Sequence, residues 1–440
     1  MTAISTIDFR INSAEQLLES VSEPASTLLY ACYGKNTSWP NDASPNTAID
    51  RISDKNEIWR DLIAGKKITG NDVSLVVKRN NWTANTVYTQ YDDTANTLYD
   101  ANTQFYVLTS NYNVYKCLYN NNSANSTVEP TYTSYATTST EADGYIWKYL
   151  YTLNTKDIQR FLSYNWMPVK TLTLDDGSAQ WGVQSAAIDG AINVILVSNT
   201  GSNYTNTSNV SISISGDGSG ANATAYVNTV SNTIANIVVT SVGTGYTFAN
   251  VVISGGGGSG ASARAIISPF GGHGSNPAYE LGGKNVMFDV LIEGSESGVL
   301  DTSNDFRQVS IIKDPLIYGL STAFSNSIFT QYLTLSLAGS GPDYVVDEYV
   351  YQGGSLATST FSGRVLTWDS ANSIMKLTEY TGTPTTTTLN GQTSGGYRYI
   401  TSTTNPTLKN RSGRVLYIDN IIPVTRAADQ TENFKIVIKY

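Results

Sequence analysis

An internal repeat between residues 191 and 267 is the feature that most constrains how this chain can fold. The first copy reads INVILVSNTGSNYT and then VSISISGDGSGANATAYV, and the second reads IANIVVTSVGTGYT and then VVISGGGGSGASARAII. Tyr204 matches Tyr246 at an offset of 42 residues, and Gly220 matches Gly260 at an offset of 40. Because glycine adopts the positive φ of tight turns without steric cost, each copy is predicted as strand, Gly-Tyr turn, strand, Gly-rich turn, strand. Two copies predict a small β module rather than a long solenoid.

Most of the remaining chain also carries strand patterns. Aromatic and β-branched residues are concentrated in the early segments 73–79, 104–110, 112–119 and 144–153. Further strand patterns follow residue 284 and continue into the tail, GRVLYIDNIIPVTRAADQTENFKIVIKY. The tail predicts a strand, a turn that contains proline, a polar stretch with Gln430 and Glu432, and a last strand FKIVIKY.

Helix signals are few and lie mostly early in the chain. Ser13 is predicted to cap a short helix, with Gln16 closing a capping box and with Leu17 and Leu18 buried. Ser53 is predicted to cap a second helix, DKNEIWRDLIA, which Gly65 ends. Asn154 is predicted to cap a third, with Ile158, Phe161 and Leu162 at helical spacing. The apolar stripes of all three helices are interpreted as core packing.

These patterns predict a multi-domain protein that is mainly β with a few helices. The N-terminal part is expected to be α+β and the other domains β-rich, and 440 residues are long enough for two or three domains. We expect an N-terminal body over 1–171, an inserted Gly-rich β-repeat module over 172–268, and a β-rich body with the C-terminal strands over 269–440. The two repeat copies cover about 191–227 and 233–267.

The charge balance excludes some classes of partner. Charged residues make up only 14% of the chain, against roughly 25% in ordinary soluble proteins. The formal net charge is −9 and the longest basic cluster is Lys66-Lys67, so a broad phosphate-binding surface is not expected. No apolar stretch approaches the roughly 20 residues that a membrane helix needs. Cys32 and Cys117 lack metal or redox spacing and are interpreted as buried apolar residues.

A catalytic interpretation has one natural starting point, the loop GGHGSNPAYELGG over residues 271–283, which holds the single histidine of the chain. His273 has only Glu280 as a nearby metal-ligand type, and no GxSxG motif surrounds any serine. The sequence therefore predicts no catalytic, metal-binding or cofactor-binding residues. The loop is interpreted as a structural turn, in which glycines allow sharp bends, Pro277 fixes one bend, and Tyr279 and Leu281 anchor the loop in a core.

Three weaker signals accompany this loop in the sequence. Paired carboxylates could catalyse glycoside hydrolysis, and the candidates are Asp175, Asp176, Asp343, Asp347, Glu348 and Asp369. The run SGDGSG at 215–220 is similar to a calcium-binding turn, but the matching run of the second copy has no aspartate. The alternating row Tyr145, Trp147, Tyr149 and Tyr151 could form a carbohydrate platform, although packing under a neighbouring element is the favoured interpretation.

Four stretches together resemble a known family. They are YGKNTSWPNDASPNTAIDRISDKNEIWRDLIAGKKIT with VVKRNNW, NVYKCLYNNNSANSTVEPT with DGYIWKYLYTL, GGHGSNPAYELGG, and GRVLYIDNIIPVTRAADQTENFKIVIKY. In this order they resemble the baseplate wedge proteins, of the type often called gene product eight, of T4-like contractile-tailed bacteriophages. The resemblance covers roughly residues 5–170 and 270–440 and leaves out the repeat module. The motif residues that carry it are His273, Gly274, Pro277, Tyr279, Glu280, Leu281, Gly282, Asp419, Asn420, Arg426, Gln430 and Glu432.

The resemblance implies a virion structural protein rather than an enzyme. It implies a homodimer in each wedge that links other baseplate wedge proteins and takes part in baseplate rearrangement during tail contraction. It also implies assembly in the host cytoplasm, no cofactor, and indirect contact with tail fibres. The charge balance and the lack of a long apolar stretch predict no nucleic-acid partner and no membrane insertion.

Two alternatives stay open beside this expectation. The first is a receptor-binding tail adhesin that recognises a host surface glycan, and the second is a tail-associated glycan hydrolase that uses the carboxylates above. Under the leading interpretation, deleting residues 172–268 is expected to leave a folded dimer. His273 is expected to hold its turn by hydrogen bonds, so that replacing it with glutamine impairs stability or assembly slightly.

Overall fold

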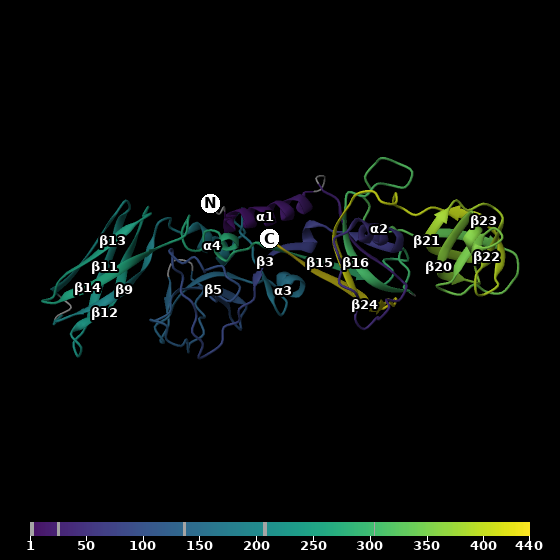
Figure 1. The fold of residues 1–440 in the computed structure, drawn as a ribbon. Coiled ribbons are helices and arrows are strands. Elements are labelled where there is room, and N and C mark those ends of the chain that lie inside the picture. The colour runs from purple at the N-terminus through teal and green to yellow at the C-terminus, as the bar shows by residue number, and fades with distance from the viewer. Residues whose placement is uncertain (1–3, 24–26, 135–137, 206–208, 303) are drawn as a thin grey trace. The chain divides into compact units, whose positions relative to one another are not determined.

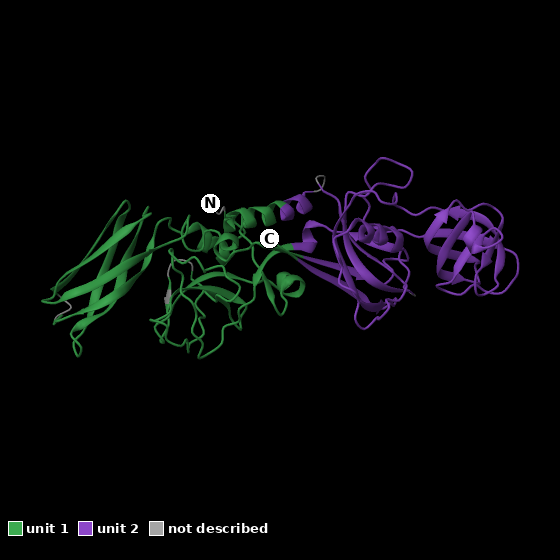
Figure 2. Cartoon of the chain, viewed as in Figure 1, with its two compact units in different colours: residues 1–16, 74–287, 438–440 green, residues 17–73, 288–437 purple. Residues whose placement is uncertain are grey.

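The chain divides into two compact units in a computed structural model that describes residues 4–23, 27–134, 138–205, 209–302 and 304–440 (Figures 1 and 2). Unit 1 comprises residues 1–16, 74–287 and 438–440, and unit 2 comprises residues 17–73 and 288–437. Strands account for 43% of the residues and helices for 12%. The expected fold class, mainly β with a few helices in a multi-domain chain, is therefore confirmed. The expected domain limits near 171 and 268 remain predictions.

Outside the repeat, unit 1 is built around an antiparallel sheet in the order β4-β5-β7-β6. Its strands are β4 (Tyr106–Leu108), β5 (Asn113–Tyr119), β6 (Ser139–Thr140) and β7 (Ile146–Thr152). A further sheet of the chain has the order β25-β15-β3-β8, in which β3 (Val73–Lys78) pairs with β8 (Trp166–Pro168). The helices are α3 (Thr155–Phe161), α4 (Ala179–Ser185) and the short α5 (Pro277–Glu280). The predicted early strands are confirmed.

The aromatic row of β7 is a packed core. Tyr145, Trp147 and Tyr149 belong to one buried cluster with Tyr88 and Tyr115, and Trp147 stacks on Tyr145 at 5.6 Å between ring centroids. The β5–β7 ladder shifts register between Val114 and Tyr115, and Tyr151 lies outside this cluster. Its hydroxyl donates to the Pro168 carbonyl instead, at 3.0 Å. Core packing, the favoured interpretation of this row, is confirmed.

The repeat forms a six-stranded sheet in which each copy supplies three strands, as predicted. The first copy forms β9 (Ile192–Ser202), β10 (Val210–Gly216) and β11 (Ser219–Asn228), and the second forms β12 (Thr233–Thr244), β13 (Ala249–Gly255) and β14 (Ser259–Ile267). The order is β10-β13-β14-β9-β12-β11, so the copies exchange strands. Ala221 of β11 pairs with Val242 of β12, and the equivalent Ala261 of β14 pairs with Thr200 of β9. The two copies are therefore related by an approximate two-fold axis and share one core.

The repeated Gly-Tyr pattern has a steric reason that crosses between the copies. Tyr204 and Tyr246 are both buried in the shared core. A Cβ on Gly258 of the second copy would lie 2.4 Å from the Tyr204 ring, and a Cβ on Gly218 of the first copy would lie 2.5 Å from Tyr246. Each tyrosine thus needs a glycine of the opposite copy, which explains why the two residue types repeat together.

Unit 2 contains a five-stranded antiparallel sheet and a closed barrel. The sheet order is β17-β2-β1-β16-β24, and the barrel order is β18-β21-β20-β19-β22-β23. The sheet strands are β1 (Leu29–Gly34), β2 (Leu62–Lys67), β16 (Asp305–Lys313), β17 (Ile328–Thr330) and β24 (Arg414–Thr425). The barrel strands are β18 (Leu333–Ala338), β19 (Tyr349–Gln352), β20 (Phe361–Asp369), β21 (Ile374–Gly382), β22 (Thr388–Gly391) and β23 (Tyr397–Thr404). Two further strands of the chain, β15 (Asn285–Glu293) and β25 (Thr431–Lys439), are neighbours.

The predicted turn at Pro423 is wrong, because β24 continues through it to Thr425. Proline cannot donate to a ladder, but β24 is the edge strand of its sheet and needs no donor on its outer side. The last strand starts at Thr431 and so includes Glu432, which was predicted to belong to a polar stretch.

Of the three predicted helices, only the third begins where expected. Asn154 caps α3 by accepting from the Asp157 backbone N–H at 2.8 Å. The first helix, α1 (Ile7–Ser22), starts well before Ser13, whose hydroxyl donates to the Phe9 carbonyl, while Thr6 accepts from the Phe9 N–H. Leu17 and Leu18 are half-buried, not buried.

The second helix, α2 (Ile52–Asp61), has no side-chain cap and ends before Leu62, where β2 begins, rather than at Gly65. Ile58 and Trp59 are buried in it, as predicted, but Leu62 and Ile63 belong to a strand. Pairing with β1 outweighs the local helix pattern there.

Candidate functional site

The loop around His273 is a tight turn that leads into α5. Pro277 occupies the first helical turn, and the Asn276 side chain caps the helix by accepting from the Tyr279 N–H at 3.0 Å. Gly274 has a φ of +91°, and a Cβ there would lie 2.4 Å from a Val183 methyl group. The glycines are therefore required by both backbone geometry and close packing.

The carboxylate of this loop is engaged in a buried ion pair. Lys116 of β5 places its ammonium 2.7 Å from Glu280 Oε2, and both side chains are 0% exposed. The other carboxylate oxygen accepts from the Gly274 N–H at 2.6 Å, and the ammonium lies 4.1 Å from the centre of the Tyr91 ring. Burial opposes the ionisation of Glu280, but the Lys116 charge and the hydrogen bonds to the carboxylate together outweigh it and hold the pKa of Glu280 well below its usual range. Burial lowers the pKa of Lys116, which Glu280 counteracts.

His273 is uncharged at neutral pH and is held by packing. Burial, together with the Lys116 charge, lowers its pKa to about 4. Its Nδ1 lies 3.9 Å from Glu280, too far for a hydrogen bond, and has no hydrogen-bond partner among the described residues. The ring packs edge-on against Tyr91, with 4.9 Å between centroids. The expectation that hydrogen bonds of His273 hold the turn is therefore wrong. The hydrogen bonds of Glu280 and Asn276 do so instead.

The other residues of this motif are structural. Leu281 is buried, as predicted, and Gly282 has a φ of +72° and lies against the Tyr99 ring. Tyr279 is only half-buried, and burial raises the pKa of its hydroxyl, with a further contribution from Asp8. A small cavity of about 210 Å³ adjoins the loop, and His273 and Lys148 line it.

The C-terminal motif forms a second buried ion pair, this time in unit 2. Arg426 donates to Glu432 Oε2 from Nε at 3.2 Å and from Nη2 at 3.1 Å, and the two side chains are 0% and 4% exposed. The same guanidinium donates to the Tyr33 hydroxyl at 2.9 Å and to the carbonyls of Asp301 and Gly294. This set of bonds uses the planar fork of arginine, which lysine could not reproduce.

The remaining C-terminal motif residues make smaller contacts. Asn420 accepts from the Gln308 amide at 2.8 Å and donates to the Asn46 carbonyl at 2.9 Å. The Gln430 carbonyl accepts from the Gly294 N–H at 2.8 Å. The Asp419 carboxylate accepts a hydrogen bond from the Tyr417 hydroxyl at 3.2 Å. All of them stabilise backbone or neighbouring side chains.

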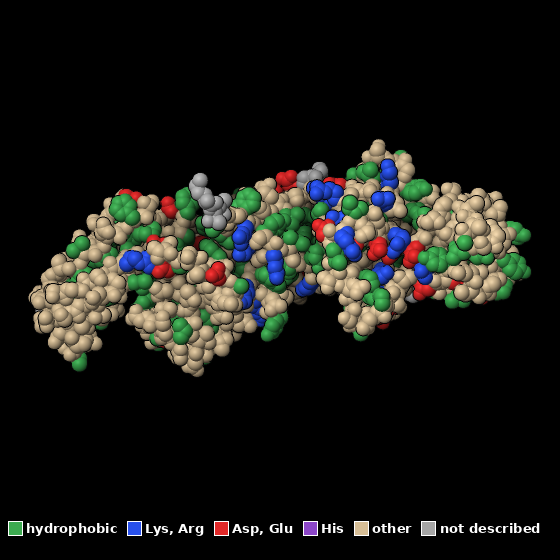
Figure 3. All heavy atoms as spheres, viewed as in Figure 1, with side chains coloured by type: hydrophobic (Ala, Val, Ile, Leu, Met, Phe, Trp, Pro, Cys, Tyr) green, Lys and Arg blue, Asp and Glu red, His purple; other side chains and the backbone are tan. Residues whose placement is uncertain are grey.

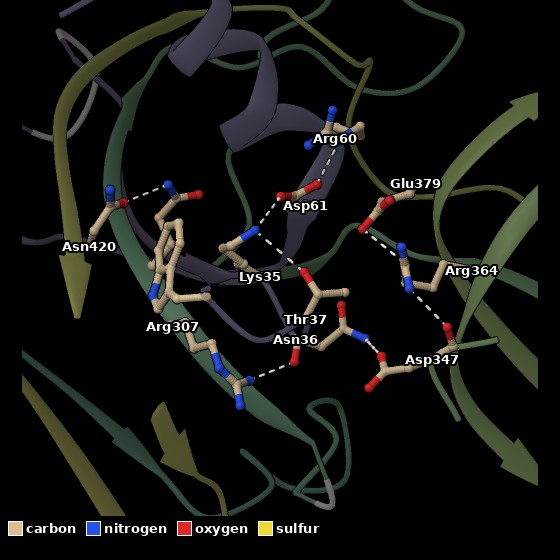
Figure 4. A network of polar contacts seen from close by, with 12 residues as sticks. Lys35, Asn36, Thr37, Arg60, Asp61, Arg307, Asp347, Arg364, Glu379 and Asn420 are labelled. Atoms are coloured by element: carbon tan, nitrogen blue, oxygen red, sulfur yellow. Dashed lines mark hydrogen bonds and ion pairs between the residues drawn. The ribbon is translucent and has the colours of Figure 1, made fainter. Parts of the chain in front are cut away.

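A polar network also joins the first motif stretch to the barrel of unit 2 (Figure 4). The Asn36 side-chain amide donates to Asp347 Oδ1 at 2.6 Å. The Asn36 backbone carbonyl accepts from the Arg307 guanidinium at 2.6 Å. Arg364 of β20 bonds Glu379 of β21 at 3.1 Å and also reaches the Asp347 carbonyl. Burial raises the pKa of Asp347, and the charges of Arg364 and Arg307 oppose this. Asp347 therefore helps to connect the sheet of unit 2 with its barrel.

Each of the six hydrolase candidates accepts hydrogen bonds from nearby groups. Glu348 is buried and accepts from the N–H groups of Val345, Thr393 and Ser394, which hold a barrel loop. Asp343 accepts from Arg398 and from the Trp368 indole. The others also bond locally: Asp175 to Gly177, Asp176 to Ser178, and Asp369 to Asn372.

Asp217 of SGDGSG has structural partners in the second copy of the repeat. Its carboxylate accepts from the Thr247 N–H and hydroxyl and from the Phe248 N–H. The hydroxyl bond is the largest cause of a pKa lowered to about 2. Among the described residues, no cluster of three or more metal-ligand side chains is present.

Lys116 and Tyr33 are the partners that sequence reasoning missed. Each lies inside a quoted motif stretch, but the contacts to Glu280 and Arg426 join residues 164 and 393 positions apart. The sequence shows only that Lys116 and Tyr33 lie within strand patterns. That pattern does not indicate which distant residue each of them contacts.

No protein-family model matches this chain, and a search of curated proteins finds no significantly similar sequence. No helix in the described part of the chain is long and apolar enough to cross a membrane.

Proposed function

We propose that this chain is a structural component of a bacteriophage tail baseplate wedge. In this proposal it is a homodimer that links other wedge proteins, carries no cofactor, catalyses no reaction and takes part in baseplate rearrangement during tail contraction. It would be assembled in the host cytoplasm and reside in the virion.

One observation carries the proposal: the four motif stretches meet in pairs through buried or part-buried polar contacts. In unit 1 the second and third stretches meet at Lys116 and Glu280, at 2.7 Å. In unit 2 the first and fourth meet where Arg426 bonds Tyr33, at 2.9 Å, and where the Trp39 indole donates to the Ile421 carbonyl. Residues that carry the resemblance thus act as joints of the fold, which is what a structural protein requires of them.

The state of the carboxylates favours this role over a hydrolase. A glycosidase needs two carboxyl groups that face a shared substrate space. The candidates here accept hydrogen bonds from nearby backbone and side-chain donors, and Glu348 is buried in doing so.

The adhesin remains a second candidate because of one surface feature. Tyr397 and Tyr399 alternate on β23 of the barrel and are 53% and 57% exposed. Adjacent exposed tyrosines are a common surface for stacking on sugar rings or on a protein partner.

Light scattering on the purified full chain tests the leading proposal, which expects a dimer. A stable trimer would contradict it and favour an adhesin. Immunogold labelling of intact virions with an antibody against this chain is expected to mark the baseplate. The adhesin instead predicts binding to host surface polysaccharide that is lost in the Tyr397→Ala/Tyr399→Ala double variant.

A further inference from the structure

Unit 1 contains a cleft of about 480 Å³ whose rim is basic. Four cationic side chains line it: Lys78, Arg79, Lys284 and Lys439. Asp100 is the one acidic side chain among its lining residues. In a chain with 36 acidic and 27 basic residues, this local excess of positive charge runs against the overall balance. In Figure 3, Lys and Arg side chains gather beside hydrophobic ones near the point where Figure 1 marks the C-terminus.

Two of the four cations donate to neutral acceptors rather than to carboxylates. Lys78 donates to the Ala101 carbonyl at 2.6 Å. Arg79 donates to the side-chain carbonyl of Asn81 at 2.8 Å and to the Ser163 carbonyl at 3.0 Å. Among the described residues, none of the four cationic side chains forms an ion pair. Their charge is therefore uncompensated at close range.

A further cation, Arg10, lies near Lys284. Burial lowers the pKa of its ammonium, and the nearby Arg10 charge lowers it further, while Asp100 opposes both. An anion that entered the cleft would relieve this repulsion and would face cations from several segments of the chain at once.

The walls between these cations are apolar and aromatic. Leu98 and Leu281 are buried beside the cleft, and the half-buried rings of Tyr99 and Trp166 line it. The Lys439 ammonium lies 5.6 Å from the centre of the Trp166 ring. A ligand that fits must therefore supply apolar groups as well as negative charge.

We propose that this cleft is a docking site for an acidic, partly hydrophobic peptide segment of a partner protein. Its volume lies in the range of roughly 300–1,000 Å³ of ordinary ligand pockets and suits a few side chains. A nucleic acid fits less well, because the net charge of −9 repels a long polyanion and the cations are confined to one cleft rather than spread along a stripe. The proposal does not depend on the proposed function.

The test is fluorescence anisotropy with the full chain and three fluorescein-labelled probes. The first probe is an eight-residue peptide of alternating glutamate and leucine, the second has glutamine in place of glutamate, and the third is an oligothymidylate of the same length. We expect only the first to bind, and its affinity to fall as sodium chloride rises from about 0.05 M to about 0.5 M.

Substitutions locate the binding. Lys284→Gln and Lys439→Gln are each expected to weaken binding of the acidic peptide about threefold, and the double variant about tenfold. Lys409→Gln, which removes an exposed charge that does not line the cleft, should leave the affinity unchanged. Circular dichroism on each variant checks that the fold is kept.

Three results would overturn the proposal. The first is no binding of the acidic peptide at about 1 mM, a concentration at which even weak specific complexes are detectable. The second is equal binding of the glutamine peptide. The third is an unchanged affinity in a correctly folded Lys284→Gln/Lys439→Gln variant. Tighter binding of the oligothymidylate than of the peptide would also overturn it and would assign the cleft to single-stranded nucleic acid.

Discussion

The Lys116 ammonium lies 2.7 Å from the Glu280 carboxylate, and neither side chain is exposed to solvent. The pair joins strand β5 to the loop that holds the chain's single histidine, across 164 positions of sequence. Because Glu280 is engaged in this pair, the loop that contains His273 has a structural role.

Removing one member of this pair should be far more harmful than removing both. Glu280→Gln leaves the buried Lys116 charge without a counter-ion, and we expect a loss of about 3–5 kcal/mol in the free energy of unfolding. The Lys116→Met/Glu280→Leu double variant should recover a large part of that loss, because no unpaired charge remains. Denaturant unfolding of each variant measures the loss in the single variant and the recovery in the double variant. Asp54→Asn, which breaks a partly exposed pair with Arg51, should cost no more than about 1 kcal/mol. Equal losses in the single and double variants would contradict the role of charge.

Stability should depend on pH through His273 in a defined window. Its pKa is about 4 in the folded chain and about 6.5 when unfolded, so between these values the unfolded state binds the additional proton. Stability is therefore lost as the pH falls from about 6.5 to about 4, by up to about 3 kcal/mol. The pKa of Glu280 is also lowered, so its contribution is lost at still lower pH.

The measurement is thermal unfolding at a series of pH values, for the native chain and for His273→Gln. Because the chain has one histidine, the variant should lose the slope between pH 6.5 and 5. Asp347, whose pKa burial raises, contributes a slope of opposite sign that both proteins keep. An unchanged slope in His273→Gln would show that another group titrates.

The two repeat copies should respond alike to equivalent substitutions. A Cβ on Gly258 would meet Tyr204, and a Cβ on Gly218 would meet Tyr246. Gly258→Ala and Gly218→Ala should each cost about 1–3 kcal/mol through overpacking. Gly354→Ala is the matched control, because nothing lies within 4 Å of its Cβ position. Calorimetry measures the effects, and a cost at only one of the two sites would contradict the exchanged core.

Removing residues 192–267 should leave the rest of the chain folded. The two ends of this segment are adjacent, because the Ser268 N–H donates to the Ala191 carbonyl at 2.9 Å and the Ser268 hydroxyl accepts from the Ala191 N–H. Deleting 172–268 also removes α4, whose Val183 packs in the aromatic cluster around Trp147. We therefore expect the shorter deletion to melt cooperatively and the longer one to be less stable. Near-ultraviolet circular dichroism follows the aromatic cluster, and aggregation of the shorter deletion would contradict this expectation.

Local patterns predicted most of the strands and one helix start, because these depend on neighbours in sequence. Asn154 caps α3 through a residue three positions away, and the repeat predicted three strands per copy. Local reasoning failed where a distant strand competed. Leu62 and Ile63 continue the apolar stripe of α2, yet both lie in β2, where Leu62 pairs with Gly34 of β1. Strand pairing and core burial stabilise these residues more than a further helical turn would. Pro423 is accommodated in β24 because the strand lies at a sheet edge.

Local sequence patterns were enough to predict the β-rich class, the repeat and the motif stretches. They also indicated that the His273 loop is a turn, since glycine and proline restrict the backbone locally. Only the tertiary structure decided what the motif residues do, which strands the two copies exchange, and that four unpaired cations line one cleft. The physical reason is that burial and charge pairing depend on distance in space. Nothing in the sequence indicates that the Lys116 ammonium and the Glu280 carboxylate will lie 2.7 Å apart in a buried pair.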